Sequence, residues 1–149
     1  MEQHAANACG TIAALHSIAN ISRLQPDLVA KGSFLEKFLE ATKNLSPQER
    51  GEYLKGNKDL EEAHKEAVQQ GESEVEDSVI THFIAFMEID GHLYELDGTK
   101  DAPVDHGEVK PENLLSKSCE VIKQFMERDP EEIRFTLMAL AKAGEPQSE

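Results

Sequence analysis

The chain has no long apolar run and few cysteines, and both absences restrict what it can be. No uninterrupted apolar stretch is longer than the five residues of Phe83–Met87, whereas a membrane-spanning helix needs about 20. The two cysteines, Cys9 and Cys119, cannot form a disulfide framework, which indicates a reducing compartment. No basic segment followed by a long apolar stretch opens the chain, so we expect no secretory signal. These absences predict a cytoplasmic protein without membrane contact.

Positive charge is also scarce. The chain carries 15 Lys and Arg against 29 Asp and Glu, a net charge of −14. Such a surface repels phosphate backbones and anionic lipids, which argues against a nucleic-acid or membrane partner and permits a basic protein partner. A length of 149 residues with 39% hydrophobic content is typical of one domain with one core. No spacing of His, Cys and Asp is typical of a metal site, and we predict no metal and no cofactor.

The start of the chain is unusual because residues 3–22 contain no Asp, Glu, Lys or Arg. Residues 7–19, NACGTIAALHSIA, place small or apolar side chains on every side of a helical wheel, which predicts a buried helix. Asn7 is the expected N-cap, so Cys9 falls in the first turn. Unpaired backbone N–H groups and the positive end of the helix dipole favour a thiolate at that position.

The remaining pattern mixes helices and strands in one α+β unit. Amphipathic surface helices are expected over residues 34–45, from the capping box Ser46-Pro47-Gln48-Glu49 through Leu54, and from Asn57 to Val68. Residues 69–77 read as an exposed acidic loop and residues 98–110 as a second loop. Strands are expected over residues 79–87, 92–96 and 133–140, with a helix that starts at Pro111 and continues through Phe125.

Asp90-Gly91 between the first two strands predicts a two-residue hairpin turn. In that register Asp97 lies opposite Ile84, and His82 lies two residues further along the same face. His82 and Asp97 are therefore diagonal neighbours, with about 7–8 Å between their backbones, and lie within reach of a side-chain hydrogen bond.

A carboxylate beside an imidazole fixes the tautomer and the orientation of the ring, as in a nucleophile–base–acid triad. Cys9 at the start of a buried helix is the candidate nucleophile, and the amide of Gln3 could stabilise the oxyanion of an acyl-transfer reaction. Structural roles stay open at this point: Cys9 as a packing residue, His82 as a hydrogen-bonded strand residue and Asp97 as a turn residue. Cys119, among apolar residues of its helix, fits core packing better than chemistry.

Several motifs resemble the ubiquitin C-terminal hydrolase family of cysteine peptidases. They are Asn7-Ala8-Cys9-Gly10-Thr11 preceded by Gln3, His82-Phe83-Ile84, residues 90–98 (DGHLYELDG), His106-Gly107, residues 125–128 (FMER) and Arg134-Phe135. The resemblance implies a papain-like core, with a buried helix that carries Cys packed on an antiparallel sheet that carries His and Asp. It implies hydrolysis of bonds to the C-terminal glycine of ubiquitin through a thioester. Cys9 is then the nucleophile, His82 the general base and acid, Asp97 its orienting group and Gln3 the oxyanion donor.

The resemblance also assigns uses to features that the residues alone leave unexplained. A segment at the position of residues 69–79 crosses the active-site cleft in the family, and the −14 charge suits the basic tail of ubiquitin. The stretch His4-Ala5-Ala6 differs from the usual family pattern, and family members carry a long segment ahead of Gln3 that includes strands. We therefore expect residues 1–149 to form a single, N-terminally incomplete catalytic domain, monomeric when folded, with a short polar tail at residues 143–149.

Two alternatives follow. The chain could be a truncated product of weak or no activity that acts at most as a ubiquitin- or protein-binding module, because missing sheet neighbours leave apolar surface and open strand edges. It could instead be a papain-like thiol enzyme that acts on another amide or ester, which the spacing of Cys9, His82 and Asp97 permits.

Overall fold

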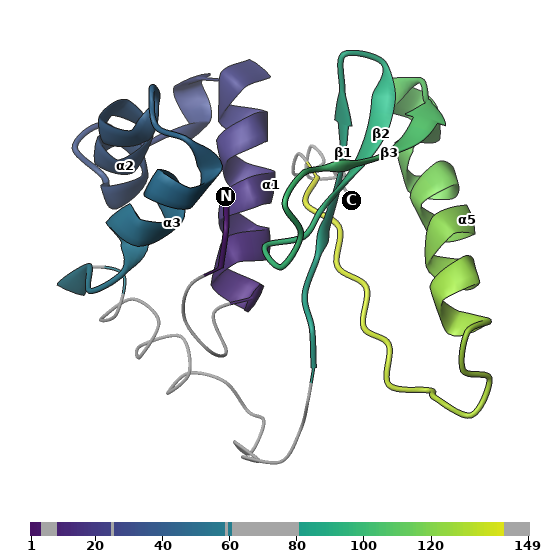
Figure 1. Ribbon diagram of the computed structural model, residues 1–149. Coiled ribbons are helices and arrows are strands. Elements are labelled where there is room, and N and C mark those ends of the chain that lie inside the picture. Colours follow the sequence, from purple (N-terminus) through teal and green to yellow (C-terminus); the bar gives the residue numbers. More distant parts are fainter. Residues whose placement is uncertain (4–8, 25, 59, 61–80, 142–149) are drawn as a thin grey trace, which may run out of the picture.

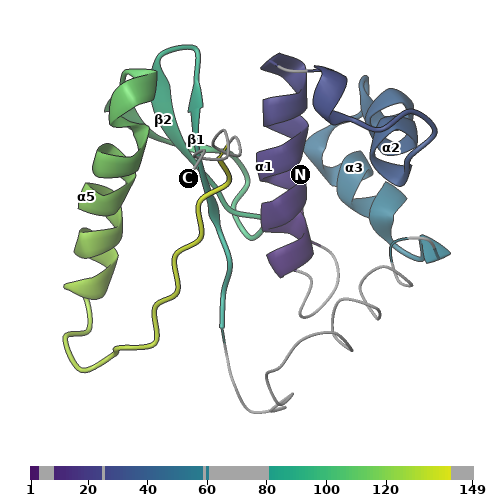
Figure 2. The same ribbon diagram turned by 180° about the vertical axis from the view of Figure 1, so that it is seen from behind.

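The protein is built in layers, with one helix between a helical pair and a sheet (Figure 1). The structure is a computed structural model that describes residues 1–3, 9–24, 26–58, 60 and 81–141. Its helices and strands are α1 (Cys9–Leu24), α2 (Phe34–Thr42), α3 (Pro47–Leu54), β1 (Ala85–Ile89), β2 (His92–Leu96), β3 (Val104–Glu108) and α5 (Leu114–Met126), with 3-10 turns at Pro26–Leu28 and Pro111–Asn113. The strands form an antiparallel sheet in the order β1-β2-β3. Seen from behind, α1 and α5 again lie on opposite sides of this sheet (Figure 2).

Helix α1 is the centre of the molecule. One of its faces packs on α2 and α3 through a cluster of Ile12, Leu15, Phe38 and Leu54. Ala13 and Ile21 contact the sheet from another face. Ala14 and Ile18 are exposed, so the prediction of a helix buried all round is correct for two faces and wrong for the third. The reason is that the described elements cover α1 from two sides only.

The two faces of the sheet carry separate apolar clusters, as the alternation of side chains along strands requires. Towards α1 the sheet presents Ala85, Met87 and Leu96. Towards α5 it presents Leu93, which is fully buried beside Val121. No helix among the described residues is both long enough and apolar enough to cross a membrane.

The hairpin predicted at Asp90-Gly91 is confirmed. Asp90 has φ 52° and Gly91 has φ 82°, and the two positive values are those of the tight turns that match strand twist. Ile89 pairs with His92. The first strand begins at Ala85 and not at residue 79: residues 81–84 have no regular structure, and residues 79 and 80 lie outside the described part. The ladder stops there because its partner strand ends at Leu96.

Strand β3 corrects the prediction of a loop over residues 98–110. Its sequence, VDHGE, has one apolar residue, so no alternation revealed it. It forms because its backbone pairs with β2, with Tyr94 opposite Asp105 and His92 opposite Glu108. The register gains one residue between these pairs, and Gly107 at φ 92° provides the positive φ at this bulge.

Local signals elsewhere are confirmed at the helix starts. Ser46 forms the full capping box with Glu49, and Pro47 stands at the start of α3. Asn57 Oδ1 accepts a hydrogen bond of 3.1 Å from the Leu60 N–H. Pro111 opens a 3-10 turn that leads directly into α5.

The strand predicted over residues 133–140 is wrong. This segment runs back from the end of α5 without regular structure (Figure 1). Apolar alternation favours a strand locally, but a strand also needs a neighbour for its backbone hydrogen bonds. The predictions for Asn7, for residues 61–80 with their acidic loop, and for the tail at 143–149 fall on residues outside the described part.

Candidate active site

Cys9 begins α1 and lies against the segment that leads into β1. It is 8% exposed, and its Sγ donates a hydrogen bond of 3.9 Å to the carbonyl oxygen of Thr81. The next residue, Gly10, faces the ring of Phe83, which would lie 3.7 Å from a Cβ added there. The thiol therefore sits beside the residue that immediately precedes His82.

His82 and Asp97 are joined as the hairpin geometry predicts. His82 Nε2 lies 2.8 Å from Asp97 Oδ1. The Asp97 side chain is 8% exposed, whereas that of His82 is 42% exposed. A buried carboxylate thus holds an imidazole whose other edge remains open to solvent, the arrangement that orients a general base.

Asp97 is also held by Thr99, whose backbone N–H and hydroxyl donate to Oδ1 at 2.9 Å and 2.8 Å. Partial burial acts to raise the pKa of Asp97. The hydrogen bonds from Thr99 and from His82 act against burial and together hold this pKa below its usual value. Asp97 is therefore a carboxylate at neutral pH, able to accept all of these donors.

Gln3 lies on the opposite side of the same turn. Its backbone N–H donates to the Gly98 carbonyl at 2.8 Å. Residue 98 must be glycine for this packing, because a Cβ there would lie 2.8 Å from Cγ2 of Ile12 and 3.1 Å from Cβ of Gln3. The N-terminal segment, α1 and the turn after β2 are thus pressed together next to Asp97.

An ionic cluster around a buried glutamate of β2 was not predicted. The Glu95 side chain is 2% exposed, pairs with Lys100 and accepts from His106 Nε2 at 2.9 Å. The cluster ties the turn after β2 to β3. The sequence does contain a signal for this burial, since Glu95 lies two residues after the buried Leu93 and therefore on the same face of the strand.

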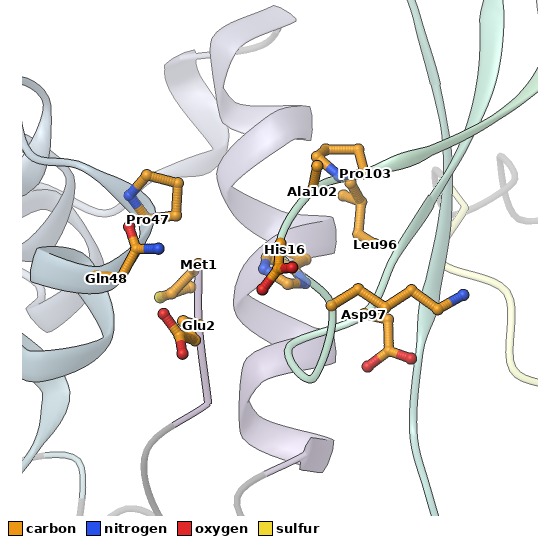
Figure 3. A pocket seen from close by; sticks show the side chains of 11 residues that line it. Met1, Glu2, His16, Pro47, Gln48, Leu96, Asp97, Ala102 and Pro103 are labelled. Carbon is orange, nitrogen blue, oxygen red and sulfur yellow. The ribbon is translucent and has the colours of Figure 1, made fainter.

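His16 lies on α1 next to a cavity of about 110 Å³ behind Asp97. Figure 3 shows this cavity between Met1 and Glu2, the start of α3 at Pro47 and Gln48, and the turn after Leu96. Burial lowers the pKa of His16 to about 4, and the charge of the Met1 amino group adds to this effect. The backbone of Leu96 and of Met1 and the charge of Asp97 act in the opposite direction. His16 is therefore a neutral imidazole at physiological pH.

The second cysteine has a different setting. Cys119 lies on α5, on the face of the sheet opposite α1, and is partly buried (Figure 1). Within the described residues, no group of three or more His, Cys, Asp and Glu side chains could hold a metal ion.

The fold and the arrangement of these residues are those of a papain-like core: a helix that begins at a cysteine packs on an antiparallel sheet, with His82 just before β1 and Asp97 just after β2. The family model described as ubiquitin carboxyl-terminal hydrolase, family 1, matches residues 1–127. The chain therefore belongs to this family.

Individual relatives agree. Ubiquitin carboxyl-terminal hydrolase 3 of Arabidopsis thaliana is 40% identical over 95% of this chain and 60% of its own length. Ubiquitin carboxyl-terminal hydrolase isozyme L1 of Rattus norvegicus is 41% identical over 97% of this chain and 64% of its own length. The UCH37 catalytic domain of Trichinella spiralis, solved with ubiquitin vinyl methyl ester, shares the fold, with a TM-score of 0.73 and 24% identity over 89% of this chain and 58% of that one. The chain thus spans about three fifths of the length of these relatives.

Proposed function

We propose that this chain is a thiol-dependent hydrolase of bonds to the C-terminal glycine of ubiquitin. The observation that carries the proposal is the His82–Asp97 hydrogen bond of 2.8 Å beside the cysteine that begins α1. Family membership supplies the substrate class, since the relatives are ubiquitin hydrolases by name and the UCH37 structure holds a ubiquitin ester probe. We further propose that the protein acts as a monomer in the cytoplasm and needs no cofactor.

The proposed reaction assigns one task to each residue. His82 takes the proton of the Cys9 thiol, and the sulfur attacks the carbonyl carbon of the ubiquitin glycine. The side-chain amide of Gln3 donates to the oxyanion that forms. Protonated His82 then gives its proton to the leaving amine, which leaves a thioester on Cys9. Water activated by His82 hydrolyses this thioester, and Asp97 keeps the ring in the required tautomer throughout.

The geometry supports these assignments through adjacent residues. The Cys9 thiol contacts the carbonyl of Thr81, the residue before His82. The backbone of Gln3 binds Gly98, the residue after Asp97. All four proposed catalytic residues are therefore gathered at the junction of α1, the entrance to β1 and the end of β2. In the proposed reaction the thiol must leave the Thr81 carbonyl to reach the His82 ring, a rearrangement that many sites undergo when substrate binds.

The test is covalent labelling with ubiquitin vinyl methyl ester, followed by intact mass. Wild type and Cys119→Ala are expected to gain one ubiquitin each, and Cys9→Ala none. Cys119→Ala is the matched control because it removes the other thiol from the opposite face of the sheet. Labelling that persists in Cys9→Ala, or that is absent from wild type, would overturn the proposal.

A second candidate, ubiquitin binding without turnover, is favoured by one observation. Residues 133–140 present apolar side chains to solvent, with Ile133 85% and Met138 84% exposed. Such a surface is typical of an interaction face. Titration calorimetry with ubiquitin, combined with the labelling experiment, separates the two functions. A pure binder shows saturable heat in the calorimeter but gains no adduct with ubiquitin vinyl methyl ester. A related modifier with a different C-terminal tail, tested in parallel, separates ubiquitin specificity from general papain-like activity.

A further inference from the structure

The turn after β2 supplies an unusual set of donors to one atom. Three hydrogen bonds converge on Oδ1 of Asp97, from His82 Nε2, the Thr99 N–H and the Thr99 hydroxyl, at 2.8, 2.9 and 2.8 Å. Two of the three come from one residue. Thr99 thus donates two hydrogen bonds to the same oxygen that binds the imidazole, and so limits rotation of the Asp97 carboxylate about χ2.

Thr99 is exposed, yet its backbone is fixed on both sides. Before it, the Gly98 carbonyl accepts a hydrogen bond from the Gln3 N–H, and Ile12 lies so near that residue 98 has no room for a side chain. After it, Lys100 pairs with the buried Glu95. The hydroxyl therefore reaches Asp97 from a turn that other contacts already hold in place. Because of this, little further conformational entropy is lost when the hydrogen bond forms.

The same sheet offers an internal comparison. His92 Nδ1 contacts both oxygens of Asp105, at 3.1 and 3.0 Å, and the N–H two residues after Asp105 donates to its Oδ1 at 2.7 Å. That residue is Gly107, which has no side-chain donor. This exposed pair shares with Asp97 the hydrogen bond from the N–H two residues later, but it has no hydroxyl donor. Its imidazole contacts both carboxylate oxygens. At Asp97, where the hydroxyl is present, the imidazole binds one.

We propose that Thr99 is a positioning residue of the catalytic site, whose hydroxyl locks the Asp97 carboxylate in the orientation that holds His82. This inference rests on the proposed function for its kinetic consequence and on the hydrogen bonds of Asp97 for its structural one. Thr99 touches neither the thiol nor the scissile bond. It acts through Asp97, so its loss leaves substrate binding intact and slows the chemical steps that need an oriented imidazole.

The matched variants are Thr99→Val, which removes the hydroxyl and keeps the branched shape, and Thr99→Ser, which keeps the hydroxyl. With a fluorogenic C-terminal amide of ubiquitin, Thr99→Val is expected to lower kcat about three- to tenfold with KM unchanged, as loss of one hydrogen bond to a charged group implies. Thr99→Ser is expected to stay within about twofold of wild type, and neither change should move the Tm, because the side chain is exposed. Unchanged kcat in Thr99→Val, an equal loss in both variants, or a loss confined to KM would overturn the inference.

A second measurement does not depend on turnover. In protein labelled with ¹⁵N-histidine, the Nε2–H of His82 is expected to exchange with water faster in Thr99→Val than in wild type or Thr99→Ser. The His92 ring, bound to Asp105, is the internal reference and should not change. If wild type hydrolyses no ubiquitin substrate, the proposed function fails and this exchange rate alone decides the role of Thr99. Equal exchange in all three proteins would overturn it.

Discussion

Single residues of this site are tuned by burial, and His16 is the clearest case. It lies in α1, lines a cavity together with Leu96 and Asp97, and is 7% exposed. Among the described residues, its Nδ1 has no hydrogen-bond partner. Burial disfavours a charge on this ring more strongly than the backbone of Leu96 and Met1 and the charge of Asp97 favour it, which explains why its pKa falls to about 4. The helix that carries Cys9 is therefore packed around an imidazole that must stay neutral.

The pH dependence of stability follows from this shift. In the unfolded chain His16 binds a proton below its usual pKa of 6.5, whereas the folded protein resists protonation down to about pH 4. The stability that the neutral His16 ring contributes is therefore present in full well above pH 6.5. It is lost as the pH falls from 6.5 towards 4, by about 1.4 kcal/mol per pH unit. Wild type should lose about 1.4 kcal/mol more than His16→Gln between about pH 7.5 and pH 5.5, measured by urea unfolding. Parallel curves for wild type and His16→Gln would contradict this account.

At the scale of elements, the β1–β2 hairpin sets the site. The turn at Asp90-Gly91 fixes the register, and the register brings His82 next to Asp97 at the far end of the strands. Each residue of slip would move a side chain to the other face of the sheet, so the pairing depends on a turn distant from it.

Gly91→Ala tests that dependence. The φ of Gly91, 82°, is strained for any residue with a Cβ, although a Cβ at this position would meet no atom within 4 Å. The substitution should lower the free energy of unfolding by about 1 kcal/mol through backbone strain alone. Gly10→Ala is the matched control, since position 10 lies in α1 and its Cβ would make only ordinary contact with Phe83. Denaturant melts of both variants give the comparison, and equal losses would rule out strain at the turn as the cause.

At the scale of the whole molecule, the chain combines a strong negative charge with three separate apolar clusters among the residues that the structure describes. One cluster lies between α1 and the helical pair, one between α1 and the sheet, and one between the sheet and α5. The site lies at the start of α1, beside the beginning of β1 and the end of β2. The chain carries a net charge of −14, which would favour encounter with the basic tail of the proposed substrate, ubiquitin.

Salt should therefore slow the reaction with ubiquitin. Raising the ionic strength from about 0.02 M to about 0.3 M should lower kcat/KM for a ubiquitin amide about three- to tenfold, because screening shortens the reach of the surface charge. The rate at which neutral iodoacetamide alkylates Cys9 is the control and should change little. A kcat/KM that is independent of salt would show that the net charge has no part in substrate capture.

Much of this architecture could be predicted, because its determinants are local. The turn chemistry of Asp90-Gly91, the capping box at Ser46 and the uncharged run around Cys9 each involve a few consecutive residues. The pairing of His82 with Asp97 followed from the turn by counting residues along two strands. The catalytic roles of these residues and of Gln3 stay predictions until the labelling and kinetic experiments are done.

The amino-acid sequence by itself determined the hairpin register, the helix starts and the family, because these depend on short-range patterns of side chains. Tertiary structure alone decided the rest. Strand β3 has one apolar residue and exists because β2 offers it backbone partners, whereas residues 133–140 have a strand pattern and form none. Thr99 and Glu95 likewise acquired their roles only when the turn after β2 folded against α1 and β3. Hydrogen bonds between segments distant in sequence require a neighbour in space, and local pattern does not specify one.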